Sequence, residues 1–184
     1  MRLTNKDKIE LLKIARETII ARLNNVDYDP LSESKVLQAH CGAFVTLHNE
    51  GRLRGCIGRF HADYELYKVI RDMALSSAFE DNRFAPVSLD EMEDIEIEIS
   101  VLTPFTRIRD VNEIELGKHG IYLQKNGRSG TFLPQVATET GWSLAEFLGH
   151  CSQDKMGLGW NGWQGADMFT YEAEVFNEKE FRKE

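Results

Sequence analysis

Residues 95–101 alternate strictly between apolar and polar side chains. Because successive side chains of a strand point to opposite faces, a period of two predicts a strand with one face in a core and the other in water. The stretch from Phe169 to Val175 repeats the pattern, so we expect a final strand there. In the first segment the apolar positions are Ile95, Ile97, Ile99 and Val101, and the polar ones are Glu96, Glu98 and Ser100.

Two hairpins are expected. Residues 42–48 and 52–57 are β-prone runs on either side of Asn49-Glu50-Gly51, where glycine permits the positive φ of a tight turn. Residues 121–133 form the second hairpin, with its turn at Asn126-Gly127. Short strands joined in this way favour antiparallel pairing.

Three helices are indicated by caps followed by apolar residues at helical spacing. Thr4 with Asp7 begins the first helix, Asp63 caps a second that runs to about Phe79, and a Ser143/Glu146 box begins a third that ends near Gln153. We therefore predict an α+β fold, an antiparallel-rich sheet with flanking helices, in one domain of residues 1–184.

The cysteines indicate the compartment. Cys41, Cys56 and Cys151 are odd in number and widely spaced, which is a poor disulfide framework and suits free thiols in the cytoplasm. The polar start of the chain and the lack of a long apolar run lead us to expect neither secretion nor a membrane span.

The net charge of the chain indicates which class of ligand it can bind. The formal net charge of -8 and a pI near 5.2 disfavour binding to nucleic acid, whose phosphates the mean field repels. Arg52, Arg54 and Arg59 nevertheless cluster in sequence, and such a cluster suits a small anionic ligand.

The strand segment 53–58, Leu-Arg-Gly-Cys-Ile-Gly, is the candidate functional centre. Gly55 and Gly58 weaken a strand and often mark a bulge or a close backbone approach. Strand alternation places Arg52, Arg54 and Cys56 on one face, where a guanidinium stabilises the thiolate of a neighbouring cysteine. A buried, unreactive Cys56 is the alternative interpretation.

Two functions follow from this segment. The first is a binding protein whose cleft is lined by Arg54, Cys56, Glu80 and Arg83. The second is a thiol-dependent enzyme in which Cys56 attacks, Arg54 lowers its pKa, and His61 or Glu80 transfers protons. The loop 79–84 forms a rim for either, although a local ion pair of Arg83 explains its charges equally well. No paired metal-ligand spacing, phosphate loop or dinucleotide motif is present, so we expect no metal site and name no cofactor.

The chain resembles the AMMECR domain family over roughly residues 42–176. The segments that carry the resemblance are Gly51-Arg52-Leu53-Arg54-Gly55-Cys56-Ile57-Gly58, Ala78-Phe79-Glu80-Asp81-Asn82-Arg83-Phe84, Glu98-Ile99-Ser100-Val101-Leu102-Thr103-Pro104, Phe132-Leu133-Pro134-Gln135-Val136, Gly141-Trp142 and Glu172-Ala173-Glu174-Val175-Phe176.

The resemblance implies a large and a small lobe with a cleft between them, near the segment 53–58. It implies association with a Memo-like protein, similar to extradiol dioxygenases, and with a radical-SAM protein, while the family name brings no established activity. With the residues above, the candidate catalytic set is Cys56, Arg54 and Glu80, and the candidate binding set is Arg52, Gly55, Gly58, His61, Asp81, Arg83 and Gln135.

Overall fold

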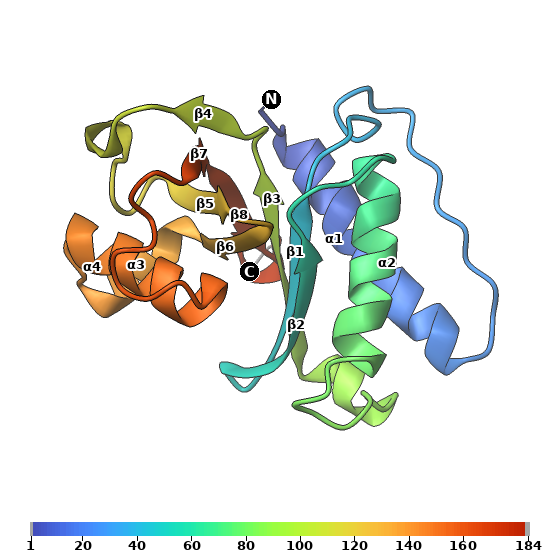
Figure 1. Ribbon diagram of the computed structural model, residues 1–184. Coiled ribbons are helices and arrows are strands. Elements are labelled where there is room, and N and C mark those ends of the chain that lie inside the picture. Colours follow the sequence, from blue (N-terminus) through green and yellow to red (C-terminus); the bar gives the residue numbers. More distant parts are fainter. Residues whose placement is uncertain (1, 183–184) are drawn as a thin grey trace. The chain divides into compact units, whose positions relative to one another are not determined.

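The computed structural model describes residues 2–182, which form two four-stranded antiparallel sheets and four α-helices (Figure 1). The predicted α+β class is confirmed. The chain divides into two compact units: one contains the residues through Leu102 and those from Glu174 onward, and the other contains Thr103–Ala173.

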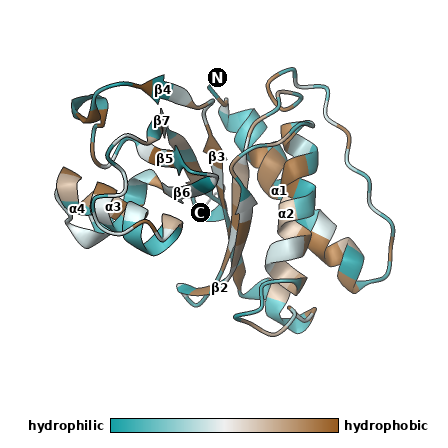
Figure 2. Cartoon of the chain, viewed as in Figure 1, coloured by the Kyte–Doolittle hydropathy of each residue, from teal (hydrophilic) through white to brown (hydrophobic). Residues whose placement is uncertain are grey.

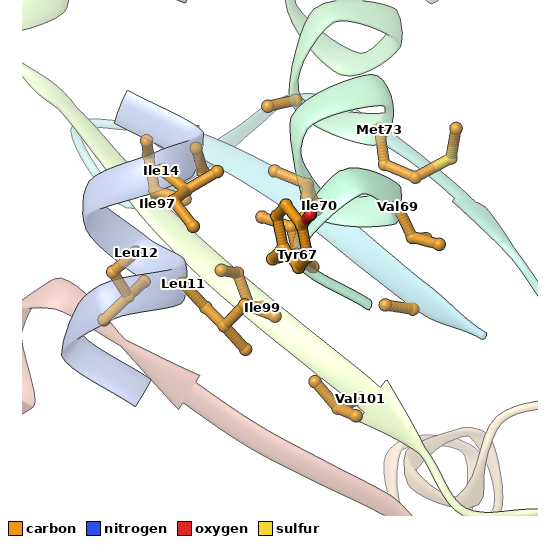
Figure 3. Close-up of a cluster of buried hydrophobic side chains, with 14 of the residues drawn as sticks. Leu11, Leu12, Ile14, Tyr67, Val69, Ile70, Met73, Ile97, Ile99 and Val101 are labelled. Atoms are coloured by element: carbon orange, nitrogen blue, oxygen red, sulfur yellow. The ribbon is translucent and has the colours of Figure 1, made fainter. Parts of the chain in front are cut away.

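The sheet of the first unit has the order β2-β1-β3-β8. Helices α1 and α2 cover one of its faces (Figure 1). Apolar residues run along β3 and α1 (Figure 2), and the close-up of Figure 3 shows side chains of α1, α2 and β3 meeting in a common core. The predicted alternation of β3 is confirmed through Ile99, because Ile95, Ile97 and Ile99 are fully buried, but Ser100, which was expected in water, is buried as well. The elements are β1 (Ala43–Asn49), β2 (Arg52–Arg59), β3 (Ile95–Leu102), β8 (Ala173–Asn177), α1 (Asn5–Leu23), α2 (Leu66–Phe79) and the 3-10 turns η1 (Asp90–Glu93) and η4 (Glu178–Phe181).

Local signals account for the ends of most of these elements. The Thr4 hydroxyl accepts a hydrogen bond from the Asp7 amide, and the Asp7 carboxylate accepts one from the Thr4 amide, so the predicted capping box of α1 is confirmed. The predicted turn between β1 and β2 is also confirmed, with φ of 49° at Glu50 and 75° at Gly51. The prediction that Asp63 caps α2 is wrong, because α2 begins after Glu65 and no side chain caps it.

The sheet of the second unit has the order β4-β7-β5-β6. The predicted hairpin is confirmed as β5 and β6, with Asn126 and Gly127 both at positive φ in the turn. The Ser143/Glu146 box begins α4, and a π-helical turn continues from it beyond the predicted end at Gln153. The elements are β4 (Thr106–Ile108), β5 (Gly120–Lys125), β6 (Arg128–Phe132), β7 (Asp167–Tyr171), α3 (Pro134–Thr140), α4 (Leu144–His150), the 3-10 turn η2 (Val111–Glu113) and the π turn η3 (Cys151–Met156).

The single final strand predicted for residues 169–175 is wrong. The chain forms β7 and β8, which belong to different sheets and are separated by Glu172. The Glu172 amide donates to the Thr103 hydroxyl, and the Thr103 amide donates to the Glu172 carbonyl, so Glu172 lies outside both ladders. The predicted alternation does not continue through this break, because Val175 is exposed in β8 and its neighbour Phe176 is fully buried.

Candidate functional site

A β-bulge at Arg54 changes the side-chain order along β2. Leu47 pairs with Gly55, but the next residue of β1, His48, pairs with Leu53, so Arg54 is the extra residue. Cys56 pairs with Thr46, on the face of the sheet that also carries His48 and Leu53, whereas Arg52 pairs with Asn49 on the opposite face. The predicted face shared by Arg52 and Cys56 is therefore wrong, because simple alternation does not survive a bulge.

The C-terminal end of α2 lies directly against β2 at Gly55. A Cβ atom on Gly55 would lie 2.2 Å from the Ser77 carbonyl oxygen, so only glycine fits without movement of the backbone. The buried Ser77 hydroxyl donates to the Val45 carbonyl at 2.8 Å and accepts from the Ile57 amide at 2.8 Å. The close approach expected at Gly55 is present, and it fixes where α2 ends relative to β2.

Two residues beyond α2, Asp81 joins β2 to the following loop. Its carboxylate accepts from the Cys56 amide at 2.9 Å, and from the Arg83 amide, Nε and Nη2 at 3.2, 2.9 and 2.7 Å. The Asp81 side chain is only 4% exposed. The Arg83 guanidinium holds the pKa of Asp81 well below its usual range, so the carboxylate is charged wherever the protein is folded near neutral pH.

The Cys56 thiol differs from the other two thiols in exposure. Cys56 is half-buried, and its sulfur accepts a hydrogen bond from the Thr46 hydroxyl at 3.2 Å. Burial raises the pKa of Cys41 to about 11 and that of Cys151 to about 12. The Arg83 guanidinium donates to the Cys56 carbonyl at 3.3 Å and is 57% exposed. Arg83 is therefore the arginine beside this cysteine.

Arg54, which was expected beside the thiol, is bonded elsewhere. Its Nε donates to Glu91 Oε1 at 2.9 Å and its Nη2 to Glu91 Oε2 at 3.2 Å. Its Nη1 donates to the Ala85 carbonyl at 2.8 Å. The bulge directs the side chain to this loop, which alternation alone does not predict.

The remaining candidates of the first unit make other contacts. Glu80 is exposed and accepts from the Ser76 hydroxyl at 2.6 Å, and His61 is an exposed residue just after β2. Gly58 is needed for packing, because a Cβ there would lie 2.2 Å from the Phe44 ring. Gln135 belongs to α3 of the second unit. A cleft between the two lobes stays a prediction.

Three residues of the cluster were missed by sequence reasoning: Thr46, Ser77 and Glu91. The spacing of Ser88 and Glu91 is typical of a capping turn, which the structure has, but it does not indicate the ion pair of Glu91 with Arg54. Ser77 is a polar residue on the apolar side of α2, and that position was the one available signal for it.

Within residues 2–182, no three histidine, cysteine, aspartate or glutamate side chains are grouped so as to hold a metal ion. None of the helices in that range combines the length and the apolar character needed to cross a bilayer.

Known proteins match the chain over most of its length. The family model AMMECR1 matches residues 12–176. A protein of Methanosarcina mazei is 36% identical over 97% of this chain and 94% of its own length, and a protein of Nanoarchaeum equitans is 34% identical over 92% and 99%. The crystal structure of the uncharacterized protein PH0010 from Pyrococcus horikoshii has a TM-score of 0.80 and 34% identity, over 92% of this chain and 90% of that one.

Proposed function

The chain belongs to the AMMECR1 family, and from this premise we propose that it binds a small anionic ligand beside Cys56, with the Arg83 guanidinium as the group that attracts it. The ligand meets the half-buried thiol and the exposed guanidinium together.

The observation that carries this proposal is the buried carboxylate of Asp81. Burying a charge costs free energy, and apolar side chains of similar volume often stabilise a fold as well as a buried ion pair does. Asp81 nevertheless fixes the Cys56 amide, the Arg83 amide and the Arg83 guanidinium with four hydrogen bonds. A costly group that orients a thiol-bearing strand and a cation is typical of a preorganised site.

Arg83 retains capacity for a ligand. Its Nε and Nη2 bind Asp81, and its Nη1 has no hydrogen-bond partner within residues 2–182. Guanidinium groups bind carboxylate and phosphate oxygens through such donors. The net charge of -8 favours a small anion over a polyanion, which would be repelled by the rest of the surface.

The test compares two alkylating agents of similar size, anionic iodoacetate and neutral iodoacetamide. The ratio of their rates at Cys56, read by peptide mass spectrometry, reports the local potential, because the thiolate fraction cancels in the ratio. Arg83→Gln should lower this ratio about fivefold, the factor that corresponds to about 1 kcal/mol for a unit charge at about 4 Å in water.

Arg59→Gln is the matched control. Arg59 also lies on β2, but its guanidinium lies over the Tyr64 ring, 5.5 Å from the ring centroid. The proposal fails if Arg83→Gln leaves the ratio unchanged, or if Arg59→Gln lowers it equally.

A thiol-dependent enzyme is the second candidate, favoured by the hydrogen bond from Thr46 to the Cys56 sulfur, because a donor to sulfur stabilises the thiolate. In it Cys56 attacks, Arg83 is the neighbouring cation in place of Arg54, and His61 or Glu80 transfers protons. Thr46→Val should then slow iodoacetamide labelling at neutral pH, and an unchanged rate argues against this candidate.

Association with a Memo-like protein and a radical-SAM protein is a further proposal, which rests on the family resemblance. Copurification of this chain with each purified partner tests it, and elution of the proteins as separate species contradicts it.

A further inference from the structure

The loop after α2 is attached to β2 at two separate places. At the first, Asp81 and Arg83 bind the backbone of Cys56. At the second, Arg54 binds residues 85–91 of the same loop. Two attachments on one strand restrain the loop more than either alone, because each limits the motion that the other leaves free.

Arg54 uses all of its guanidinium nitrogens at the second attachment. Besides the paired bonds to Glu91 and the bond to the Ala85 carbonyl, Nη2 approaches the Pro86 carbonyl at 3.5 Å. The Arg54 side chain is 16% exposed. All three guanidinium nitrogens bind residues of the loop, so Arg54 acts on the loop.

Glu91 accepts hydrogen bonds from the loop residue Ser88 and from Arg54 of β2. Its Oε2 accepts from the Ser88 amide at 2.9 Å and the Ser88 hydroxyl at 3.2 Å, in addition to the bonds from Arg54. The Arg54 guanidinium keeps the pKa of Glu91 below its ordinary value. Glu91 therefore ties the far end of the loop to the bulge of β2.

We infer that Arg54 and Glu91 are positioning residues for the anion site: their ion pair holds the loop so that Arg83 stays beside Cys56. This inference rests on the function proposed above. It assigns a role to the bulge, which directs Arg54 toward the loop, and it separates Arg54 from the residues that meet the ligand.

The decisive variant is Glu91→Gln, because positioning and direct electrostatics predict opposite results. Removing a nearby negative charge would by itself raise the ratio of iodoacetate to iodoacetamide labelling at Cys56. If Glu91 positions Arg83, the ratio falls instead, and we expect a fall of at least twofold. The double variant Glu91→Gln, Arg83→Gln should lower the labelling ratio no further than Arg83→Gln alone. Both changes remove the same effect, the presence of the Arg83 guanidinium beside Cys56.

A ratio that rises or stays constant in Glu91→Gln overturns the inference, even if the melting temperature falls. If Glu91→Gln does not fold, Arg54→Lys replaces it: lysine keeps the charge but not the paired geometry, so a lower ratio supports positioning and an unchanged ratio refutes it.

A second measurement separates this inference from the proposed function. The Phe84 amide bonds to the Asp81 carbonyl and the Val87 amide to the Ala78 carbonyl, so hydrogen exchange at these two amides reports the order of the loop. If Arg83→Gln leaves the labelling ratio unchanged, the anion site fails. Faster hydrogen exchange in Glu91→Gln would then still show that the Arg54–Glu91 ion pair orders the loop. Unchanged exchange would refute that role as well.

Discussion

Replacing Gly55 by alanine perturbs the contact between β2 and the end of α2. The new Cβ would lie 2.2 Å from the Ser77 carbonyl oxygen and 3.1 Å from its carbon. The distance to the oxygen is about 1.3 Å short of van der Waals contact, which begins near 3.5 Å. Both partners are backbone atoms, so no side-chain rotation relieves the clash and the helix end has to move away from the strand.

The expected loss of stability has two parts. Overpacking of a closed contact costs about 1 to 3 kcal/mol. Moving α2 also weakens the hydrogen bonds that Ser77 makes to Val45 and Ile57, each worth about 1 kcal/mol. We therefore expect Gly55→Ala to lower the free energy of unfolding by about 2 to 4 kcal/mol.

Urea unfolding followed by far-UV circular dichroism measures this loss, with Gly51→Ala as the control. Gly51 has no atom within 4 Å of an added Cβ, but its φ is 75°, so alanine there costs only backbone strain, about 1 kcal/mol. The reasoning is refuted if Gly55→Ala is destabilised no more than Gly51→Ala.

Three further predictions concern the remaining contacts. Asp81→Asn should lower the free energy of unfolding by about 2 kcal/mol at pH 7, since the bonds to Arg83 are charge-assisted. Because the pKa of Asp81 is lowered in the folded protein, its carboxylate stabilises the fold above about pH 4, and this stabilisation declines at lower pH. The urea unfolding curves of Asp81→Asn and wild type should therefore converge toward pH 2. An equal difference in free energy of unfolding at pH 7 and pH 2 contradicts this. Cys56 should be alkylated before Cys41 and Cys151 at pH 8, because a thiol of pKa about 11 is ionised at that pH in only about one molecule in a thousand. Simultaneous labelling of all three cysteines in peptide maps would contradict this prediction. Thr4→Ala should lower the free energy of unfolding by about 1 kcal/mol through loss of the α1 capping box, whereas Thr138→Ala, an exposed threonine within α3, should change it by less than about 0.5 kcal/mol.

Local chemistry made much of the fold predictable. The period of β3, the two hairpin turns and the boxes at Thr4 and Ser143 depend on residues close together in sequence. The division of residues 169–175 into two strands was not predictable in this way, because Glu172 leaves the ladder through bonds to Thr103, which lies far away in the chain.

The candidate site shows the same limit. Gly55 and Asp81 were identified because glycine in a strand and a carboxylate at a helix end are local signals. The identity of the arginine beside Cys56 was not available locally. One extra residue in β2 turns Arg54 toward Glu91 and leaves the position beside the thiol to Arg83, and a bulge is determined by pairing with β1.

The bonds of Asp81 and Arg83 to Cys56 have a consequence for solubility. β2 is the outermost strand of its sheet, and an open strand edge offers free amide and carbonyl groups on which a strand of another molecule can assemble. At Cys56 the amide is bound by the Asp81 carboxylate and the carbonyl by the Arg83 guanidinium. A foreign strand has to displace the buried Asp81 carboxylate and its partly exposed partner Arg83 before it can extend the sheet here, so we expect this pair to hinder edge-to-edge association.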